Sequence, residues 1–169
     1  MFRKVTDRIY YRPHDGATDR PNIGLILGDK YTLMFDAGNS AANVASLRAE
    51  LAAQGLPEPD FVAVSHWHWD HTFGMHAWGV PTIAGWQTNE QLKTVQTWAW
   101  DDDSMKAREE RVEDINFCNV MIAQEYPDRS QIRVTTADIV FDGCMPLVVE
   151  GGVPPEVIKR YLHRFCQRR

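Results

Sequence analysis

The sequence predicts a mixed α/β fold, because short apolar segments typical of strands alternate with longer segments of helical periodicity. Residues 8–12 and 23–27 are rich in β-branched and aromatic side chains. The turn signal Gly28-Asp29-Lys30 follows, so residues 31–35 are expected to complete a hairpin with 23–27. A chain of 169 residues suits one domain with a sizeable core.

A helix and two further strands are expected next. Apolar side chains recur at helical spacing over residues 41–54, Asn39 or Ser40 can cap the start of that helix, and a glycine ends it. Residues 61–64 are wholly apolar, as in a strand covered on both faces, and residues 81–84 predict the next strand. This alternation supports the α/β class.

The region after these strands is expected to be mainly helical. Residues 88–123 predict a helical stretch in two pieces, and Asp101-Asp102-Asp103-Ser104 supplies an N-cap and an acidic first turn. The spacing of these acids fits no calcium loop. Residues 137–141 and 145–149 flank Asp142-Gly143, a hairpin signal.

Composition excludes several classes of protein. The net charge of −5 argues against a nucleic-acid surface, and no apolar run is long enough to span a membrane. No signal peptide is visible behind the N-terminal residues. The cysteines Cys118, Cys144 and Cys166 are odd in number and widely spaced, so we expect reduced thiols and a cytoplasmic protein.

Residues 66–71, His-Trp-His-Trp-Asp-His, are the segment that predicts chemistry. His66 and His68 are two residues apart just beyond an expected strand, so both imidazoles can point to one side. Asp70 and His71 add an oxygen and a further nitrogen. This donor set suits zinc, with iron or manganese as alternatives, and a metal there would activate water and polarise a carbonyl or phosphoryl oxygen.

The segment resembles the H-x-H-x-D-H signature of the metallo-β-lactamase superfamily, and residues 35–38, Phe-Asp-Ala-Gly, resemble the strand-end Asp-x-Gly of that family. The resemblance implies an αββα sandwich and one or two metal ions. By resemblance, His66 and His68 would bind the first metal, Asp70 and His71 the second. Asp70 would help to orient the attacking water. Asp36 would contact the metal ligands without binding the metal itself.

The resemblance covers residues 1–153, which are therefore expected to form the first half of such a sandwich. The family takes three more ligands from later segments: a histidine in a Gly-His segment, a bridging aspartate in a Gly-Asp segment, and a last histidine. None of these has a counterpart here. Two ligands per metal would leave the site under-coordinated.

The remaining histidines are poor substitutes. His14 lies in a loop rich in Pro and Asp and is expected to be solvated. His76 would point away from His71 if both lay on one helix. His163 lies opposite the apolar stripe of a predicted helix over residues 154–169, so it is expected to face solvent.

That C-terminal segment, 154–169, is expected to be a basic amphipathic helix with a net charge of +4. Two explanations stay open: accidental sequence after a frameshift, or a helix that covers sheet surface which the family's second half would bury. The missing half also predicts an exposed apolar sheet face, and with it either a homodimer that covers this face or poor solubility.

Two functions follow. The first is a metal-dependent hydrolase, in which a metal-bound hydroxide attacks an ester, thioester, amide or phosphodiester of a small-molecule substrate. The second is a catalytically inactive remnant or a metal-binding or interaction module. The tryptophans Trp67, Trp69, Trp78 and Trp86 could line a pocket, but core packing is expected for most of them.

Overall fold

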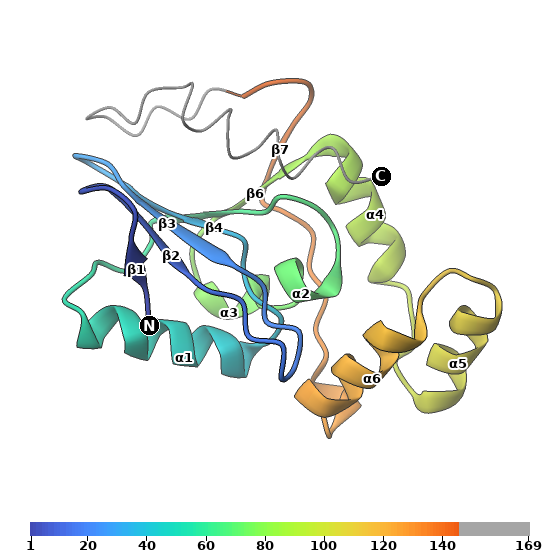
Figure 1. The fold of residues 1–169 in the computed structure, drawn as a ribbon. Helices are drawn as coiled ribbons and strands as arrows, with labels where there is room; N and C mark the ends of the chain where they lie inside the picture. The colour runs from blue at the N-terminus through green and yellow to red at the C-terminus, as the bar shows by residue number, and fades with distance from the viewer. Residues whose placement is uncertain (146–169) are drawn as a thin grey trace.

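The computed structural model describes residues 1–145 and contains one mixed sheet in this range, with helices packed against one of its faces (Figure 1). The sheet follows the chain in order: β1 (Arg3–Lys4), β2 (Ile9–Arg12), β3 (Ile23–Leu27), β4 (Thr32–Phe35), β5 (Phe61–Ala63), β6 (Thr82–Gly85) and β7 (Ile139–Phe141). Strands β1 to β4 pair antiparallel, and β4 to β7 pair parallel. The mixed α/β prediction is confirmed.

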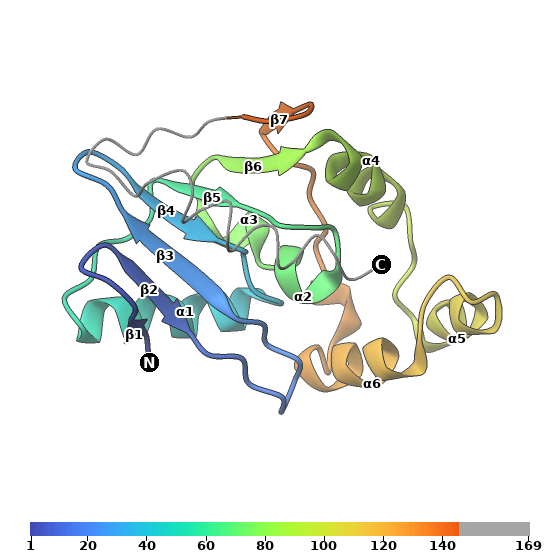
Figure 2. The same ribbon diagram turned by 45° about the horizontal axis from the view of Figure 1, so that its top comes forward.

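Helix α1 (Ala41–Ala53) connects β4 to β5 and begins as the sequence predicts. The Ser40 side chain accepts a hydrogen bond from Asn43 N at 2.9 Å, and Gly55 follows the helix with a φ of +64°. Leu47 and Leu51 are fully buried. They pack on the sheet through Leu25, Met34 and Val62, together with α3 (Met75–Trp78) (Figure 2).

The opposite face of the sheet is also apolar. Strand register aligns Ile9, Ile26, Leu33 and Phe61 in one row across four strands, and Phe35, Ala63 and Ile83 form another row. Leu33 and Ile83 are buried, whereas the other side chains are partly exposed. The second face is thus apolar, as predicted, but these side chains are less exposed than expected. The two layers that the described residues form are a sheet and one helical layer.

The helical region after β6 differs from its prediction. Residues 86–125 form three helices instead of two: α4 (Trp86–Val95), α5 (Asp102–Glu110) and α6 (Asn116–Glu125). The extra break comes between α5 and α6, where Val112 has a φ of +59° and ends α5. A left-handed residue cannot continue a right-handed helix, but nothing in the type of this residue signals it. Asp101 caps α5 through Ser104 N, as predicted.

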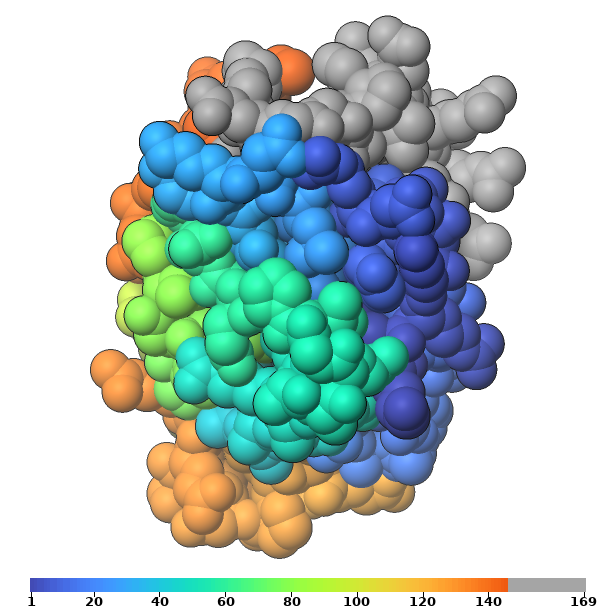
Figure 3. All heavy atoms as spheres, turned by 90° about the vertical axis from the view of Figure 1, so that its left-hand side faces the viewer, coloured from blue at the N-terminus to red at the C-terminus, as the bar shows by residue number. Residues whose placement is uncertain are grey.

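These helices and α2 (Trp69–Thr72) enclose a second core at the side of the sheet, formed by Trp69, Phe73, Met105, Ile122 and Tyr126 with neighbouring apolar residues. A short 3₁₀ turn, Arg129–Gln131, then leads to β7. Figure 3 shows the other side of the molecule, where the first strands and α1 form a continuous surface with the region of α6 below it.

Some expectations lie outside the described residues: most of the partner strand 145–149, the helix 154–169 with His163, and Cys166. Cys118 and Cys144 are free thiols, as expected. Within residues 1–145, no helix has the length and the hydropathy that crossing a membrane would need.

Candidate metal centre

The turn after β4 packs against the segment that carries the candidate site. Asp36 has a φ of +68° and Gly38 a φ of +80°, so the chain reverses sharply at the end of the strand. Aspartate tolerates this left-handed conformation better than most residues. The Asp36 backbone N–H donates to Ala63 O at 2.8 Å, which holds the turn against the end of β5, and the side chain is buried.

The Asp36 carboxylate contacts both ends of the histidine segment. Its Oδ1 accepts hydrogen bonds from Ser65 N and Ser65 Oγ, each at 2.8 Å. Its Oδ2 lies 2.8 Å from His71 Nδ1. One carboxylate therefore fixes the residue before His66 and the residue that ends the segment.

The backbone of the segment packs directly on the same turn. Ala37 N donates to His71 O at 2.8 Å, and Gly74 N donates to Gly38 O at 2.9 Å. A Cβ on Gly74 would lie 2.3 Å from Ala37 O, so only glycine fits here. Gly74 separates α2 from α3, which corrects the single helix assumed for His71 and His76.

The four predicted ligand residues lie together. The ring centroids of His66 and His68 are 4.6 Å apart, and those of His66 and His71 are 4.2 Å apart. Asp70 Oδ2 lies 2.9 Å from His71 Nε2. The segment between β5 and the first turn of α2, two elements that Figure 2 labels, thus brings three imidazoles and one carboxylate together beside Asp36.

The histidines differ in protonation. Burial lowers the pKa of His66 to about 4, helped by the neighbouring rings of His71 and His68, and burial likewise lowers the pKa of His68. Burial also opposes charge on His71, but the carboxylates of Asp36 and Asp70 outweigh it and raise its pKa to about 10. At neutral pH, His66 and His68 are neutral while His71 is an imidazolium.

The types of these residues suit a metal ion, but the number of donors that are suitably placed among the described residues is too small. Neutral imidazoles with free lone pairs are the form in which histidine binds metals, and carboxylate oxygen suits the same ions. The buried Nδ1 of His71 lies close to Asp36 but has no aligned hydrogen bond. Within residues 1–145, however, no group of three or more His, Cys, Asp or Glu side chains has the geometry to hold an ion.

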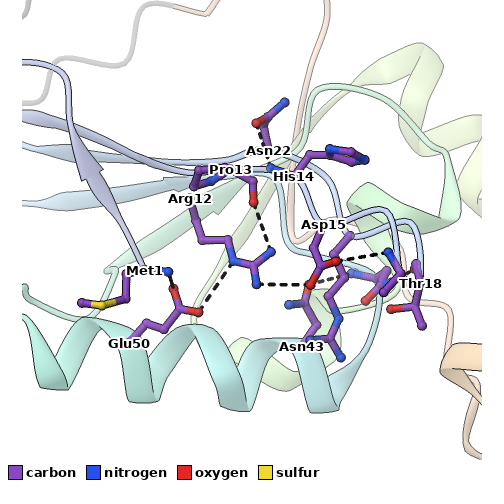
Figure 4. Close-up of polar contacts among 12 residues, drawn as sticks. Met1, Arg12, Pro13, His14, Asp15, Thr18, Asn22, Asn43 and Glu50 are labelled. Carbon is purple, nitrogen blue, oxygen red and sulfur yellow. Dashed lines mark hydrogen bonds and ion pairs between the residues drawn. The ribbon is translucent and has the colours of Figure 1, made fainter.

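The other described histidines lie apart from this arrangement. His14 is exposed, as predicted, and its backbone N–H donates to Asn22 Oδ1 at 3.0 Å. Figure 4 shows its ring directed away from the contacts of Arg12 with Asp15 and Glu50. His76 is on α3, beside the backbone of Arg133.

Two acidic residues near the site were missed by the sequence analysis. Asp19 has a φ of +54°, and burial and the charge of Asp70 raise its pKa, which places it near that carboxylate. Its loop is held by Asn39 Nδ2, which donates to Thr18 O at 2.7 Å. Asp114, before α6, lies near His68, because its charge raises the pKa of that ring against the lowering effect of burial. No motif marks either residue, because both reach the site through tertiary packing.

The tryptophans agree in part with the expectation of core packing. Trp69 and Trp78 are buried, and Trp67 is partly exposed. Trp86, in contrast, is 53% exposed at the start of α4. Trp78 Nε1 donates to Ala37 O at 3.0 Å and so helps to hold the turn below the site.

Several metallo-beta-lactamases are among the solved structures of similar fold. The native FEZ-1 metallo-beta-lactamase from Legionella gormanii matches with a TM-score of 0.57 and 14% identity over 89% of this chain and 49% of that one. BJP-1, a subclass B3 metallo-beta-lactamase of Bradyrhizobium japonicum, gives the same TM-score and identity over 89% and 48%. The DIM-1 metallo-beta-lactamase gives 0.55 and 16% over 88% and 54%.

The chain therefore spans about half the length of each of these structures, and at such identities the likeness concerns the fold. It confirms the predicted half of a metallo-β-lactamase-like sandwich. Among curated proteins, none matches the sequence significantly. The family model of the metallo-beta-lactamase superfamily, however, matches residues 17–156. This chain belongs to the metallo-beta-lactamase superfamily.

Proposed function

We propose that this chain is a metal-dependent hydrolase of its superfamily, with the metal held by the segment His66 to His71. The observation that carries the proposal is the closeness of the His66 ring to those of His68 and His71, with centroids 4.6 and 4.2 Å apart, and of Asp70 Oδ2 to His71 Nε2, 2.9 Å apart. Zinc, iron or manganese suits these donors. The substrate would be a small molecule with an ester, thioester, amide or phosphodiester bond.

The residues have distinct roles in this proposal. His66 and His68 would offer neutral ring nitrogens to one ion, and Asp70 and His71 would offer an oxygen and a nitrogen beside it. A bound divalent metal would supply Lewis acidity and lower the pKa of water. Asp70 would help to orient the attacking water, and Asp36 would hold the His71 ring from the opposite side, where its Oδ2 lies 2.8 Å from His71 Nδ1.

The second candidate is a metal-binding or interaction module without hydrolytic activity. It is favoured by the lack of a third suitably placed donor in residues 1–145 and by the pairing of His71 with two carboxylates, which a metal would have to disrupt. Such a module would bind metal weakly, because affinity falls when protein ligands are missing.

Metal analysis of the purified 169-residue protein tests the proposal. We expect one or two zinc ions per chain, lost in His66→Ala and in His68→Ala and retained in the matched control His14→Ala, since His14 is exposed. Metal-dependent hydrolysis of 4-nitrophenyl acetate, abolished by Asp70→Asn with the zinc at His66 and His68 retained, would separate the hydrolase from the module. Metal-free protein, with the same thermal stability in the variants, would contradict the hydrolase and leave the interaction module as the remaining candidate.

A further inference from the structure

A cavity of about 260 Å³ opens directly beside the candidate metal centre, and His68 is part of its wall. Its remaining walls come from α2, from the connection between α4 and α5, and from the start of α6, all at the side of the sheet (Figure 2). A cavity of about 150 Å³ is enough for benzene. This one therefore has room for a single substituted ring or a compact branched alkyl group.

The walls are mainly aromatic. Trp67 lies against His68 with ring centroids 4.6 Å apart, and Trp100 lies between Phe73 at 5.1 Å and Trp98 at 5.9 Å. The rings of Trp98 and Trp100 are fixed from behind by one buried cation. The guanidinium carbon of Arg108 lies 4.7 Å from each ring centroid, and its Nη1 donates to Ala99 O at 2.7 Å.

The charged residues of the wall are both acidic, Glu113 and Asp114. Glu113 is paired with Arg111, whose Nε and Nη2 donate to it at 3.1 and 3.0 Å, so its charge is largely balanced. Asp114 accepts one hydrogen bond from Ile115 N at 2.8 Å and forms no ion pair with any residue of the described part. Arg108 is not part of the wall and lies behind the tryptophans.

A polar donor in this wall has only a weak acceptor. The indole Nε1 of Trp69 is buried and lies beside the sulfur of Cys118, with no oxygen or nitrogen acceptor within residues 1–145. Trp69 is only 6% exposed, and Cys118 keeps its proton because burial raises the thiol pKa to about 12. A ligand that brings a carbonyl or ether oxygen to this wall would give the indole N–H a stronger acceptor than sulfur.

We propose that this cavity binds the non-reacting part of the substrate, and that this part is a compact apolar group with a positive charge, such as an aryl- or alkylammonium. Aromatic faces attract cations, and one carboxylate without an ion-pair partner adds to that attraction. The buried cation nearby, Arg108, interacts with Asp114 but lies behind the tryptophan rings and not in the wall, so an anionic group would meet Asp114 directly. The proposal rests on the proposed function, because His68 joins the cavity to the candidate metal centre.

Binding of three probes of similar size to the metal-free 169-residue protein tests the proposal: benzyltrimethylammonium, benzyl alcohol and phenylacetate. Isothermal titration calorimetry and tryptophan fluorescence would report the affinities without any turnover. We expect the cation to bind at least about tenfold more tightly than the anion, with the alcohol between them. No measurable binding, or an anion that binds as tightly as the cation, would overturn the proposal.

A pair of isosteric variants locates the charge effect. Asp114→Asn should weaken binding of the cation by about tenfold and leave binding of the alcohol unchanged. Glu113→Gln is the matched control and should change both affinities by less than about twofold, because Arg111 already balances that carboxylate. Equal effects of the two variants would contradict the role of Asp114.

The outcome is separable from that of the proposed function. Zinc binding at His66 and His68 with no preference among the probes would overturn the assignment of the cavity and leave the metal centre standing. Probe binding with the expected preference in a protein that takes up no zinc would overturn the metal centre and leave the assignment of the cavity standing.

Discussion

The two ends of the histidine segment are built differently. His66 and His68, at the end of β5, are neutral rings with one hydrogen bond to Ser65 as their described support, whereas His71, on α2, is an imidazolium between the carboxylates of Asp36 and Asp70. His66 and His68 are ready to bind a metal, whereas His71 is held by ion pairs with Asp36 and Asp70. The same six residues thus serve both as donors and as a structural anchor.

The largest effect is expected when the anchor is broken by Asp36→Asn. Asp36 is 3% exposed, and its loss would leave a buried imidazolium with one carboxylate and would weaken the acceptor for Ser65. Breaking a buried ion pair on one side costs about 3 kcal/mol of unfolding free energy. Urea unfolding of the metal-free protein measures it.

Asp60→Asn is the matched control for this change. Asp60 accepts a backbone hydrogen bond from Thr32 at 2.7 Å but contacts no histidine, and it is exposed. Its loss should cost no more than about 1 kcal/mol. Similar losses in the two variants would show that Asp36 acts only as a backbone acceptor.

The pH dependence of stability should have opposite slopes on the two sides of neutrality. The folded pKa of His71 is raised to about 10, so its stabilisation is complete below the unfolded pKa of about 6.5 and is lost as the pH rises towards 10. The folded pKa of His66 is lowered to about 4, so its contribution is present above about 6.5 and is lost as the pH falls towards 4.

Urea unfolding in EDTA across pH 4 to 10 would measure both slopes, each of which approaches about 1.4 kcal/mol per pH unit for one proton. His71→Gln should flatten the alkaline side, and it should also reduce the acid slope, because the charge of His71 helps to lower the pKa of His66. His66→Gln should flatten the acid side alone. A profile in which His66→Gln flattens the alkaline side would show that the charges are assigned to the wrong rings.

Zinc binding should distinguish the two ends through proton release. At pH 6.5, below the pKa of about 7 that zinc-bound water can reach, His66 has no proton to lose at the ligating nitrogen and His68, whose pKa is lowered, is mainly neutral, whereas His71 carries a proton. We expect about one proton per ion bound next to His71. Calorimetry in buffers of different ionisation enthalpy measures it, and His71→Gln should abolish the release.

The sequence predicts the end of the segment at His66 and His68 better than the end at His71. Hydrophobic pattern and the Ser40 cap suffice for the strands and α1, and the spacing of His66 and His68 places both rings on one side of the chain. The pairing of Asp36 with Ser65 and His71 joins residues about 30 positions apart through a left-handed turn. It could be anticipated from family resemblance but not from spacing.

The cavity beside His68 was least predictable. Its walls depend on how α5 and α6 fold back towards α2, which turns on the left-handed Val112 and on the stacking of Arg108 against Trp98 and Trp100. Such contacts between distant segments leave no periodic pattern in a sequence. Asp114 accordingly appears as an ordinary acidic residue until the structure places it next to His68.

The smallest effect is expected from Ser65→Ala, which cuts the link between the two ends. The Ser65 hydroxyl donates to Asp36 Oδ1, so its oxygen can accept the proton of His66 Nδ1, 2.9 Å away. That contact directs the free lone pair of His66 to Nε2. Loss of the hydroxyl should cost about 1 kcal/mol of stability and weaken zinc binding about tenfold.

Ser130→Ala is the control for this variant, since Ser130 Oγ donates to Asp128 at 2.6 Å on an exposed turn and touches no histidine. Competition with a zinc chelator would give the affinities of both variants. If Ser65→Ala binds zinc as tightly as the control, the His66 tautomer is set by something other than Ser65. The anchor at Asp36 and the donor pair at His66 and His68 would then be independent parts, joined by the backbone of residues 65–71 and not by a hydroxyl between them.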